Sequence, residues 1–279
     1  MAIEIHPLTR VIGAEIRGVD LRLPLRADEV AAIERALLEH LVVFFREQFL
    51  SDAQQRDFAA HFGALEPYVL APAVNPEVPE LHTLRFDDGA AARGSRVDCW
   101  HTDGSFMRCP PLGTVLRAVE LPECGGDTCW ASMVAAYQAL SPPIQQMLAG
   151  LEAEHDFMKI SYTTFDDCED PAAELAKLRS RYPVMRHPVV RTHPVTGRKL
   201  LYVNRNYVTR LVGLSERENE ILLPFLFDHV RDPLFQCRFR WAPGSIAFWD
   251  NRATQHYGVP DYQSRRAMHR LVISGDQPR

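Results

Sequence analysis

Apolar residues recur at strand and helix spacings through the first fifty residues. Residues 14–19 alternate apolar and polar side chains, which is typical of a strand with one buried face. Residues 27–41 place apolar side chains every three or four positions, the spacing of an amphipathic helix. The β-branched and aromatic run at 41–45 predicts a buried strand directly after this helix.

A second helix is indicated by its capping residues. Ser51 is followed three residues later by Gln54, and this pair forms a capping box in which each side chain bonds to the backbone of the other. We expect the helix that follows to carry Phe58 and Phe62. Gly63 is the residue at which it should end.

The rest of the chain alternates loops, short strands and inserted helices. Residues 67–112 are rich in proline and lack periodicity, which predicts a long loop with short strands. Helical patterns occur near 133–151, 171–180 and 215–230, and strand patterns at 184–192, 199–204, 235–241, 245–250 and 267–274. This mixture predicts a mainly β fold with added helices around a jelly-roll core, that is, a double-stranded β-helix. No segment resembles a linker, so we expect one domain over 1–279.

Composition narrows the functional classes. The 279 residues carry 36 acidic and 31 basic side chains, a formal net charge of -5, which disfavours a general nucleic-acid binder. The chain contains no apolar run of about 18 residues and does not start with a signal-peptide pattern, so we expect a cytoplasmic protein without a membrane partner. Six cysteines lack zinc-site spacing and predict free, mostly buried thiols.

Two histidines and one aspartate are candidate metal ligands. His101 and Asp103 are two apart, so in an extended segment both side chains reach the same point. A strand ending near Asp250 leads through a turn to His256. Two imidazoles and one carboxylate form the facial triad of non-haem Fe(II) oxygenases. A His-x-Asp pair alone is weak support, since a single late histidine is usually packed or exposed.

Two arginines near the end of the chain are candidate anion ligands. Arg266 and Arg270 share one face of the strand predicted there. Two buried guanidinium groups would each require an anion, so the pair either binds anions or lies at the surface. The pattern by itself favours the surface.

When all the motifs of the chain are considered together, anion binding by the two arginines becomes the favoured interpretation. In chain order the series comprises His101-Thr102-Asp103, Gly125-Gly126-Asp127-Thr128, Val190-Arg191-Thr192-His193-Pro194, Trp249-Asp250-Asn251-Arg252, His256, Arg266 and Arg270. Over 18–276 the series resembles the taurine dioxygenase family of Fe(II)- and 2-oxoglutarate-dependent dioxygenases, a group that also contains alkylsulfatases and aryloxyalkanoate dioxygenases.

The resemblance implies a role for each matching residue. His101, Asp103 and His256 match the catalytic iron ligands of the family. Thr128 and Arg266 match the residues that bind the distal carboxylate of the cosubstrate 2-oxoglutarate, and Arg270 matches the arginine that binds the anionic group of the substrate. Fe(II), 2-oxoglutarate and O2 are therefore the expected cofactors. Family members are commonly homo-oligomers, so a dimer or tetramer is expected.

Departures from the taurine enzymes fall in the substrate pocket. The segment after Phe62-Gly63 reads Ala64-Leu65-Glu66-Pro67-Tyr68-Val69 where a histidine is usual. Val97 replaces an asparagine, Gly104 a valine and Tyr207 a phenylalanine, while Ile160-Ser161 replaces a Ser-Phe pair. We therefore place Tyr68, Val97, Gly104 and Tyr207 with Arg270 in the substrate pocket.

The expected reaction is hydroxylation of a small anionic substrate. A taurine-like sulfonate is the first choice; its product would release sulfite and an aldehyde, with succinate and CO2 from 2-oxoglutarate. An alkyl sulfate ester or a carboxylate is the alternative, and the lost polar partners favour a longer or less polar anion than taurine, because a buried ammonium without partners is costly. Two other classes compete, a zinc hydrolase with the same ligands and a non-catalytic jelly-roll binding protein.

Overall fold

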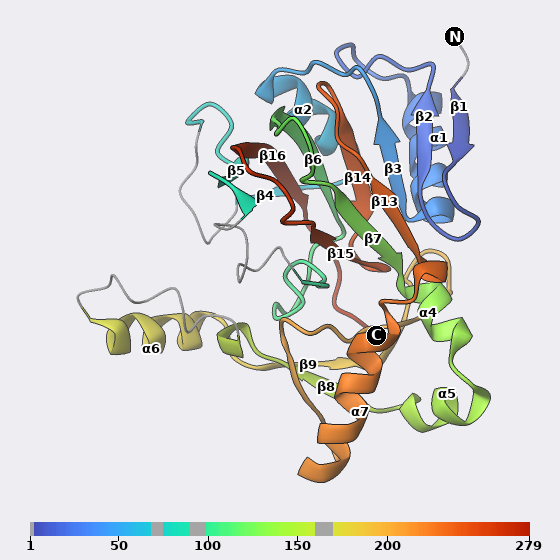
Figure 1. The fold of residues 1–279 in the computed structure, drawn as a ribbon, viewed down its shortest axis with the longest axis vertical. Helices are drawn as coiled ribbons and strands as arrows, with labels where there is room; N and C mark the ends of the chain where they lie inside the picture. Colours follow the sequence, from blue (N-terminus) through green and yellow to red (C-terminus); the bar gives the residue numbers. More distant parts are fainter. Residues whose placement is uncertain (1–2, 68–74, 90–98, 160–169) are drawn as a thin grey trace.

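The computed structural model describes residues 3–67, 75–89, 99–159 and 170–279 (Figure 1). Its helices are α1 (Ala27–His40), α2 (Asp52–Ala60), α4 (Met133–Ala139), α5 (Pro142–Leu148), α6 (Pro171–Arg181), α7 (Glu216–His229) and the 3-10 turn η2 (Pro233–Phe235). Its strands are β1 (Glu4–Pro7), β2 (Ala14–Arg17), β3 (Val42–Phe45), β4 (Leu65–Glu66), β5 (His82–Phe86), β6 (Gly113–Glu120), β7 (Thr128–Ser132), β8 (Glu152–His155), β9 (Met185–Pro188), β10 (Val190–Thr192), β11 (Lys199–Leu201), β12 (Val208–Leu211), β13 (Gln236–Phe239), β14 (Ile246–Asp250), β15 (Thr254–Gly258) and β16 (Arg266–Ile273).

The largest sheet joins the two ends of the described chain. Its strand order is β1-β2-β3-β14-β6-β16-β4, and β5 also pairs with β16. The central strands β3 and β14 are buried along their whole length, in agreement with their continuous apolar and aromatic sequences. Because β16 pairs with β6 on one side and with β4 and β5 on the other, it is an interior strand of this sheet.

A second sheet packs against the first and closes the core. It consists of β13, β7 and β15, all antiparallel. Phe44 of β3 stacks on Phe239 of β13 with ring centroids 4.0 Å apart, and it meets Trp130 of β7 edge-on at 5.3 Å. Two facing sheets with apolar side chains between them form the predicted jelly-roll core, which is confirmed.

The capping box at Ser51 is confirmed, but the end of its helix was predicted too late. Ser51 Oγ accepts the Gln54 N–H at 3.2 Å, and Gln54 Oε1 accepts the Ser51 N–H at 2.8 Å. The helix ends at Ala60, because the N–H groups of His61 and Phe62 bond three residues back in a tighter turn. Phe62 nevertheless packs on Phe58, with ring centroids 5.4 Å apart.

Two predicted elements are each divided into two in the structure, and several strands were not predicted. The pattern at 133–151 divides into α4 and α5, because Pro142 starts a new helix rather than continuing the first. The pattern at 184–192 divides into β9 and β10. Strands β6, β7, β8, β12 and β15 were not predicted. In β7 all five residues are buried, so the strand has no polar face to produce alternation.

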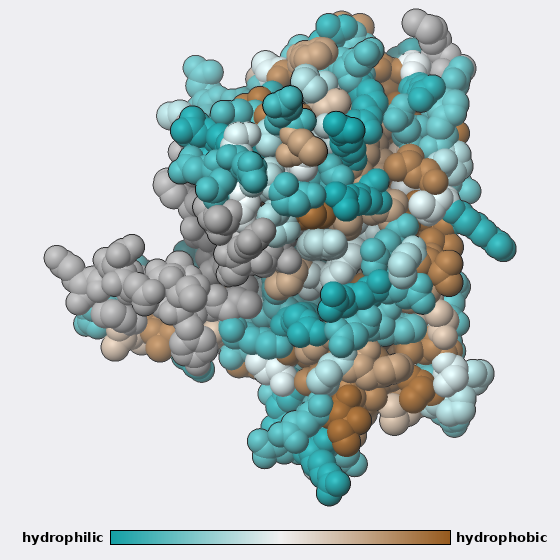
Figure 2. Space-filling view, in the orientation of Figure 1, coloured by the Kyte–Doolittle hydropathy of each residue, from teal (hydrophilic) through white to brown (hydrophobic). Residues whose placement is uncertain are grey.

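β10 pairs with β11 in a two-stranded sheet, and the lower part of Figure 1 contains a three-stranded sheet together with α4, α5, α6 and α7. Strands β12, β8 and β9 form this sheet beside α7, and α6 projects from the main body. Figure 2 shows hydrophobic residues gathered toward this lower part, where Figure 1 places α5 and α7. None of the helices in the described residues is long and apolar enough to cross a membrane.

The cysteines agree only partly with expectation. Cys99, Cys109, Cys124, Cys129 and Cys237 are free, as predicted, and Cys168 lies outside the described residues. The prediction that they are mostly buried is wrong for the described ones. Cys129 and Cys237 are buried, whereas Cys109 and Cys124 are exposed.

The stacking between the sheets leads to a stability prediction. Phe44 is fully buried, so Phe44→Ala should lower the free energy of unfolding by about 3–5 kcal/mol through lost contacts and the cavity left behind. Phe49→Ala is the matched control, because that ring is 63% exposed and its loss should change stability by less than about 1 kcal/mol. Urea denaturation of both variants measures the difference, and equal losses would contradict the proposed packing role.

Candidate active site

Three side chains from two distant segments meet at one buried point. His101 and His256 form an isolated antiparallel bridge, with each backbone N–H donating to the carbonyl of the other at 3.1 and 2.9 Å. Asp103 Oδ1 lies 3.6 Å from His101 Nε2, and Asp103 Oδ2 lies 3.9 Å from His256 Nε2. One ligand atom from each residue lies within 4.8 Å of the others. The structure therefore brings together the three residues predicted as metal ligands.

Positive charge surrounds the carboxylate of Asp103. Arg270 Nη1 lies 3.3 Å from Asp103 Oδ1, and the hydroxyl of Thr114 donates to Oδ2 at 3.2 Å. Burial by itself would raise the pKa of Asp103, but Arg270 and the two imidazoles outweigh it and hold that pKa well below its usual range. Asp103 is therefore an anion throughout the neutral range.

Each of the two imidazoles directs its Nε2 toward Asp103. His101 Nδ1 is 2.8 Å from the carbonyl oxygen of Cys99, so the tautomer that donates this hydrogen bond leaves Nε2 free to face Asp103. Burial, followed by the neighbouring His101, lowers the pKa of His256 to about 3. Among the described residues no group forms a hydrogen bond with His256 Nδ1.

This donor set fits a transition-metal ion. Imidazole nitrogen and carboxylate oxygen bind such ions at about 2.0–2.2 Å, so two ligand atoms of one ion can be up to about 4.4 Å apart. The separations of 3.6 and 3.9 Å fall below that limit. Three ligands from one side leave the remaining positions of an octahedral ion open, as the Fe(II) facial triad requires.

Arg266 forms a second cationic site in the interior. Its Nε donates to the Gly126 carbonyl at 3.0 Å, and Nη2 lies 3.4 Å from the hydroxyl oxygen of Thr128. Trp241 Nε1 also donates to this oxygen, at 3.0 Å. Burial lowers the pKa of Arg266 to about 10, so the group stays charged at neutral pH. No carboxylate of the described residues pairs with it. The guanidinium is buried, unlike the surface position that the local pattern alone favoured, and its place in the interior agrees with the anion-binding role that the whole series of motifs implied.

The glycine at 126 allows this approach. A Cβ at that position would lie 3.0 Å from Arg266 Cδ, and its φ of +71° is one that other residues rarely adopt. The Gly-Gly-Asp-Thr motif thus contributes two residues to the surroundings of Arg266. Its glycine makes room for the arginine, and its threonine supplies the hydroxyl.

A pocket lies beside the three candidate ligands, and Asp103 forms part of its lining. Arg270 and Glu66 are the charged side chains of its described lining apart from Asp103, and the other lining residues are Pro67, Gly104, Phe106, Met107, Pro111, Tyr207 and Val272. Gly104, Tyr207 and Arg270, all predicted for the substrate pocket, therefore do line one cavity. Tyr68 and Val97 were also predicted there, but they lie outside the described residues, as does Ile160-Ser161.

His82 is a site residue that sequence reasoning missed. It lies on β5 directly opposite Arg270 of β16, and it is buried. Burial and the charge of Arg270 lower the pKa of His82 to about 4, whereas Asp103 acts in the opposite direction. No carboxylate follows His82 by two residues, so nothing local distinguished it. Only the pairing of β5 with β16 places it near the other groups.

Comparison with known proteins defines the class. The family model described as "Taurine catabolism dioxygenase TauD, TfdA family" matches residues 4–272. A sulfate ester dioxygenase from Pseudomonas putida, named as dependent on alpha-ketoglutarate, is 38% identical over 100% of this chain and 91% of its own. An alkylsulfatase from Acinetobacter baylyi is 35% identical over 98% of this chain and 86% of its own. A crystal structure titled as a putative taurine dioxygenase from Burkholderia xenovorans superposes with a TM-score of 0.84 at 39% identity, covering 99% of this chain and 94% of that one.

The chain belongs to the TauD/TfdA family. It is an Fe(II)- and 2-oxoglutarate-dependent dioxygenase, as the resemblance implied, and its cofactors are Fe(II), 2-oxoglutarate and O2. Family membership decides against the zinc hydrolase and the non-catalytic binding protein. A hydrolase also has no use for a second buried cation such as Arg266.

Buried histidines beside the site make stability depend on pH. Burial lowers the pKa of His187 to about 4 and that of His155 well below its usual range. Between pH 6.5 and 4 the unfolded chain therefore binds more protons than the folded one, and stability falls as the pH falls.

We expect the free energy of unfolding of the metal-free protein to drop by up to about 1.4 kcal/mol per pH unit for each such histidine. Urea denaturation with a chelator at pH 7.5, 6.5 and 5.5 measures this slope, and His187→Gln should reduce it. Equal stability of the unmodified protein at pH 7.5 and 5.5 would disprove the prediction.

Proposed function

We propose that this dioxygenase hydroxylates a small organic monoanion, at the carbon that carries a sulfonate or sulfate ester group. His101, Asp103 and His256 hold the iron in this proposal, with Asp103 contributing the single negative charge of the ligand set. The observation that carries it is the pair of buried arginines beside this triad. Arg270 faces the pocket and Asp103, whereas Arg266 has no carboxylate partner among the described residues.

Arg266 and Thr128 are assigned to the cosubstrate. A buried guanidinium without a counter-ion is costly, and a dicarboxylate that supplies one removes this cost. The fork of Arg266 can bind both oxygens of the distal carboxylate of 2-oxoglutarate, and Thr128 adds a hydroxyl. When bound, Fe(II) with 2-oxoglutarate and O2 supplies the oxidative decarboxylation that gives succinate and CO2 and hydroxylates the substrate.

Arg270 and the pocket lining are assigned to the substrate. The guanidinium binds the anionic head and orients the adjacent carbon, while the side chains of Phe106, Met107 and Tyr207 exclude water from the apolar body. The carboxylate of Glu66 disfavours a second negative charge on the substrate. Hydroxylation beside a sulfonate gives sulfite and an aldehyde, and hydroxylation beside a sulfate ester gives sulfate and an aldehyde.

The three relatives described above support the same class of head group. Their names specify sulfate esters, alkyl sulfates and taurine, all of which carry a sulfur oxyanion. The mostly apolar lining favours an alkyl chain over the aminoethyl group of taurine, because an ammonium loses its hydration on entering such a pocket.

The proposal extends to the organisation of the protein. We infer a single domain over 1–279, since β1 and β16 belong to one sheet. A homo-oligomer is supported by exposed apolar residues on two helices, Met147 of α5 and Ile221 and Phe225 of α7. A reducing compartment such as the cytoplasm suits the free cysteines of the described residues.

The test is substrate-dependent formation of succinate by the Fe(II)-loaded enzyme with 2-oxoglutarate and O2. Hexyl sulfate, hexane-1-sulfonate, taurine and phenoxyacetate are compared, and sulfate, sulfite and hexanal are measured with succinate. We expect the two hexyl compounds to stimulate turnover more than taurine, with sulfate or sulfite equimolar to succinate. A preference for taurine would contradict the proposal that the substrate has an apolar alkyl chain. Stimulation by phenoxyacetate alone would contradict the proposal that its head group is a sulfonate or a sulfate ester.

Substitution of each of the two arginines should raise the KM for a different compound. Arg266→Ala should raise the KM for 2-oxoglutarate by roughly ten- to a hundredfold, the equivalent of a charged hydrogen bond of about 1.5–3 kcal/mol. Arg270→Ala should raise the KM for the organic anion by a similar factor. Arg265→Ala is the control, because that side chain is half exposed and pairs only with Asp87 among the described residues. The assignment is wrong if both buried variants alter the same KM.

A further inference from the structure

Three consecutive residues of the first ligand segment are tied to the segment that carries the last ligand. His101 exchanges backbone hydrogen bonds with His256. The hydroxyl of Thr102 donates to the Thr254 carbonyl at 3.0 Å. Asp103 is bound by the side chain of Asn251. The two segments are 148 positions apart at this last contact, yet each residue of 101–103 has its own partner.

The side chain of Asn251 forms hydrogen bonds with both the N–H and the carbonyl group of Asp103. Its Oδ1 accepts the Asp103 N–H at 2.9 Å, and its Nδ2 donates to the Asp103 carbonyl at 2.9 Å. The second hydrogen of Nδ2 serves the carbonyl of Pro111 at 3.1 Å. Asn251 is fully buried, and its own N–H donates to the Leu112 carbonyl at 2.9 Å. One side chain therefore orients Asp103 with every donor of its amide group in use.

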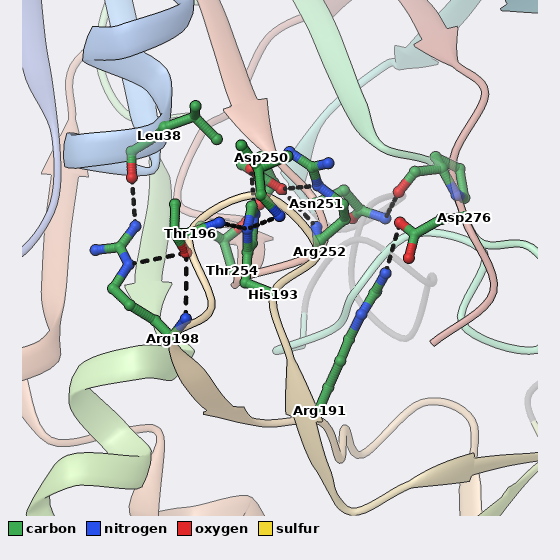
Figure 3. A network of polar contacts seen from close by, with 12 residues as sticks. Leu38, Arg191, His193, Thr196, Arg198, Asp250, Asn251, Arg252, Thr254 and Asp276 are labelled. Carbon is green, nitrogen blue, oxygen red and sulfur yellow. Dashed lines mark hydrogen bonds and ion pairs between the residues drawn. The ribbon is translucent and has the colours of Figure 1, made fainter. Parts of the chain in front are cut away.

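The turn that carries Asn251 is itself fixed by a buried ionic network (Figure 3). The Asp250 carboxylate accepts two hydrogen bonds from the Arg252 guanidinium, at 2.9 and 2.7 Å, and lies 2.9 Å from His193 Nε2. Thr254 Oγ1 donates to the Asp250 carbonyl at 2.8 Å. The turn leads directly into β15 and His256, so its position determines both His256 and the amide that binds Asp103.

We propose that Asn251 is a positioning residue for the metal site, which sets the carboxylate of Asp103 relative to His256. The inference rests on the proposed ligand set. The side chain of Asn251 forms its hydrogen bonds with the backbone of Asp103 and of Pro111 rather than with a ligand side chain, so it acts through the backbone of Asp103. Its function is to keep the donor atoms together before a metal arrives, so that binding does not have to order them.

The pattern of donors and acceptors specifies asparagine here. The site presents one N–H and two carbonyl oxygens, which match one amide oxygen and one amide NH2 group. Aspartate has the same shape but would place a carboxylate oxygen against two carbonyl oxygens, with no hydrogen to share. Asn251→Asp therefore removes two hydrogen bonds and introduces repulsion with almost no change in volume.

A second asparagine offers a matched control. Asn219 of α7 is also buried, accepts the Leu211 N–H at 2.6 Å and donates to the carbonyls of Leu211, Leu214 and Ser215. Its role in the backbone resembles that of Asn251, but it stabilises the start of α7 rather than a ligand segment. Asn219→Asp thus reproduces the chemical change away from the proposed metal site.

The experiment titrates Co(II) into the metal-free protein and follows its visible absorption, without cosubstrate or substrate. Asn251→Asp should weaken Co(II) binding by about ten- to a hundredfold and alter the spectrum of the bound ion. Asn219→Asp should lower the Tm but leave the Co(II) affinity of the folded protein unchanged. Circular dichroism establishes that each variant is folded at the temperature of the titration, and Asn251→Ala replaces Asn251→Asp if the latter is unfolded.

The outcomes separate the inference from the proposed function. Unchanged Co(II) affinity in a folded Asn251 variant, together with loss of binding in Asp103→Ala, would overturn the positioning role and leave the ligand set intact. Equal weakening in Asn219→Asp and Asn251→Asp would also overturn it, since a general loss of stability would then explain both. Unchanged binding in Asp103→Ala would instead refute the ligand set itself.

Discussion

The buried negative charge of Asp103 is the constraint on which the rest of the site depends. A carboxylate removed from water must be compensated by cations and hydrogen-bond donors, and here Arg270, Thr114 and two imidazoles surround it. The same requirement explains why a metal ion suits this position, because an ion adds positive charge where the donor atoms already converge. Burial of His256 keeps its imidazole neutral and able to donate a lone pair.

A single strand carries the two arginines that we propose bind the two organic anions. Arg266 and Arg270 lie four residues apart on β16, and both are buried, but their surroundings differ. Arg270 shares its charge with Asp103, whereas Arg266 meets a carbonyl and a hydroxyl oxygen. A dicarboxylate at Arg266 therefore gains a full ion pair, while an anion at Arg270 must compete with Asp103. Under the proposed assignment, this difference would let one sheet distinguish the cosubstrate from the substrate.

Features that depend on neighbouring residues could be predicted from the sequence, whereas contacts between distant segments could not. The capping box at Ser51, the helix over α1 and the buried strands β3 and β14 depend on residues a few positions apart, so their patterns sufficed. The metal and cosubstrate candidates were also found, because their residue types are restrictive and their order matched a known family. His82 and Asn251 could not be assigned, since their roles come from β5 lying beside β16 and from a contact across 148 positions. Strand β7 was missed because both its faces are buried.

The place of β16 in the sheet has a consequence for biosynthesis. Among the described strands it is the last to leave the ribosome, yet it lies between β6 and the β4 and β5 strands and carries both arginines. Until it inserts, β6 lacks one neighbour, and Asp103 lacks the guanidinium that neutralises it. The nascent chain therefore exposes the unpaired edge of β6 while most of the protein has already been made. Chaperones that bind exposed strand edges have their longest opportunity during that interval.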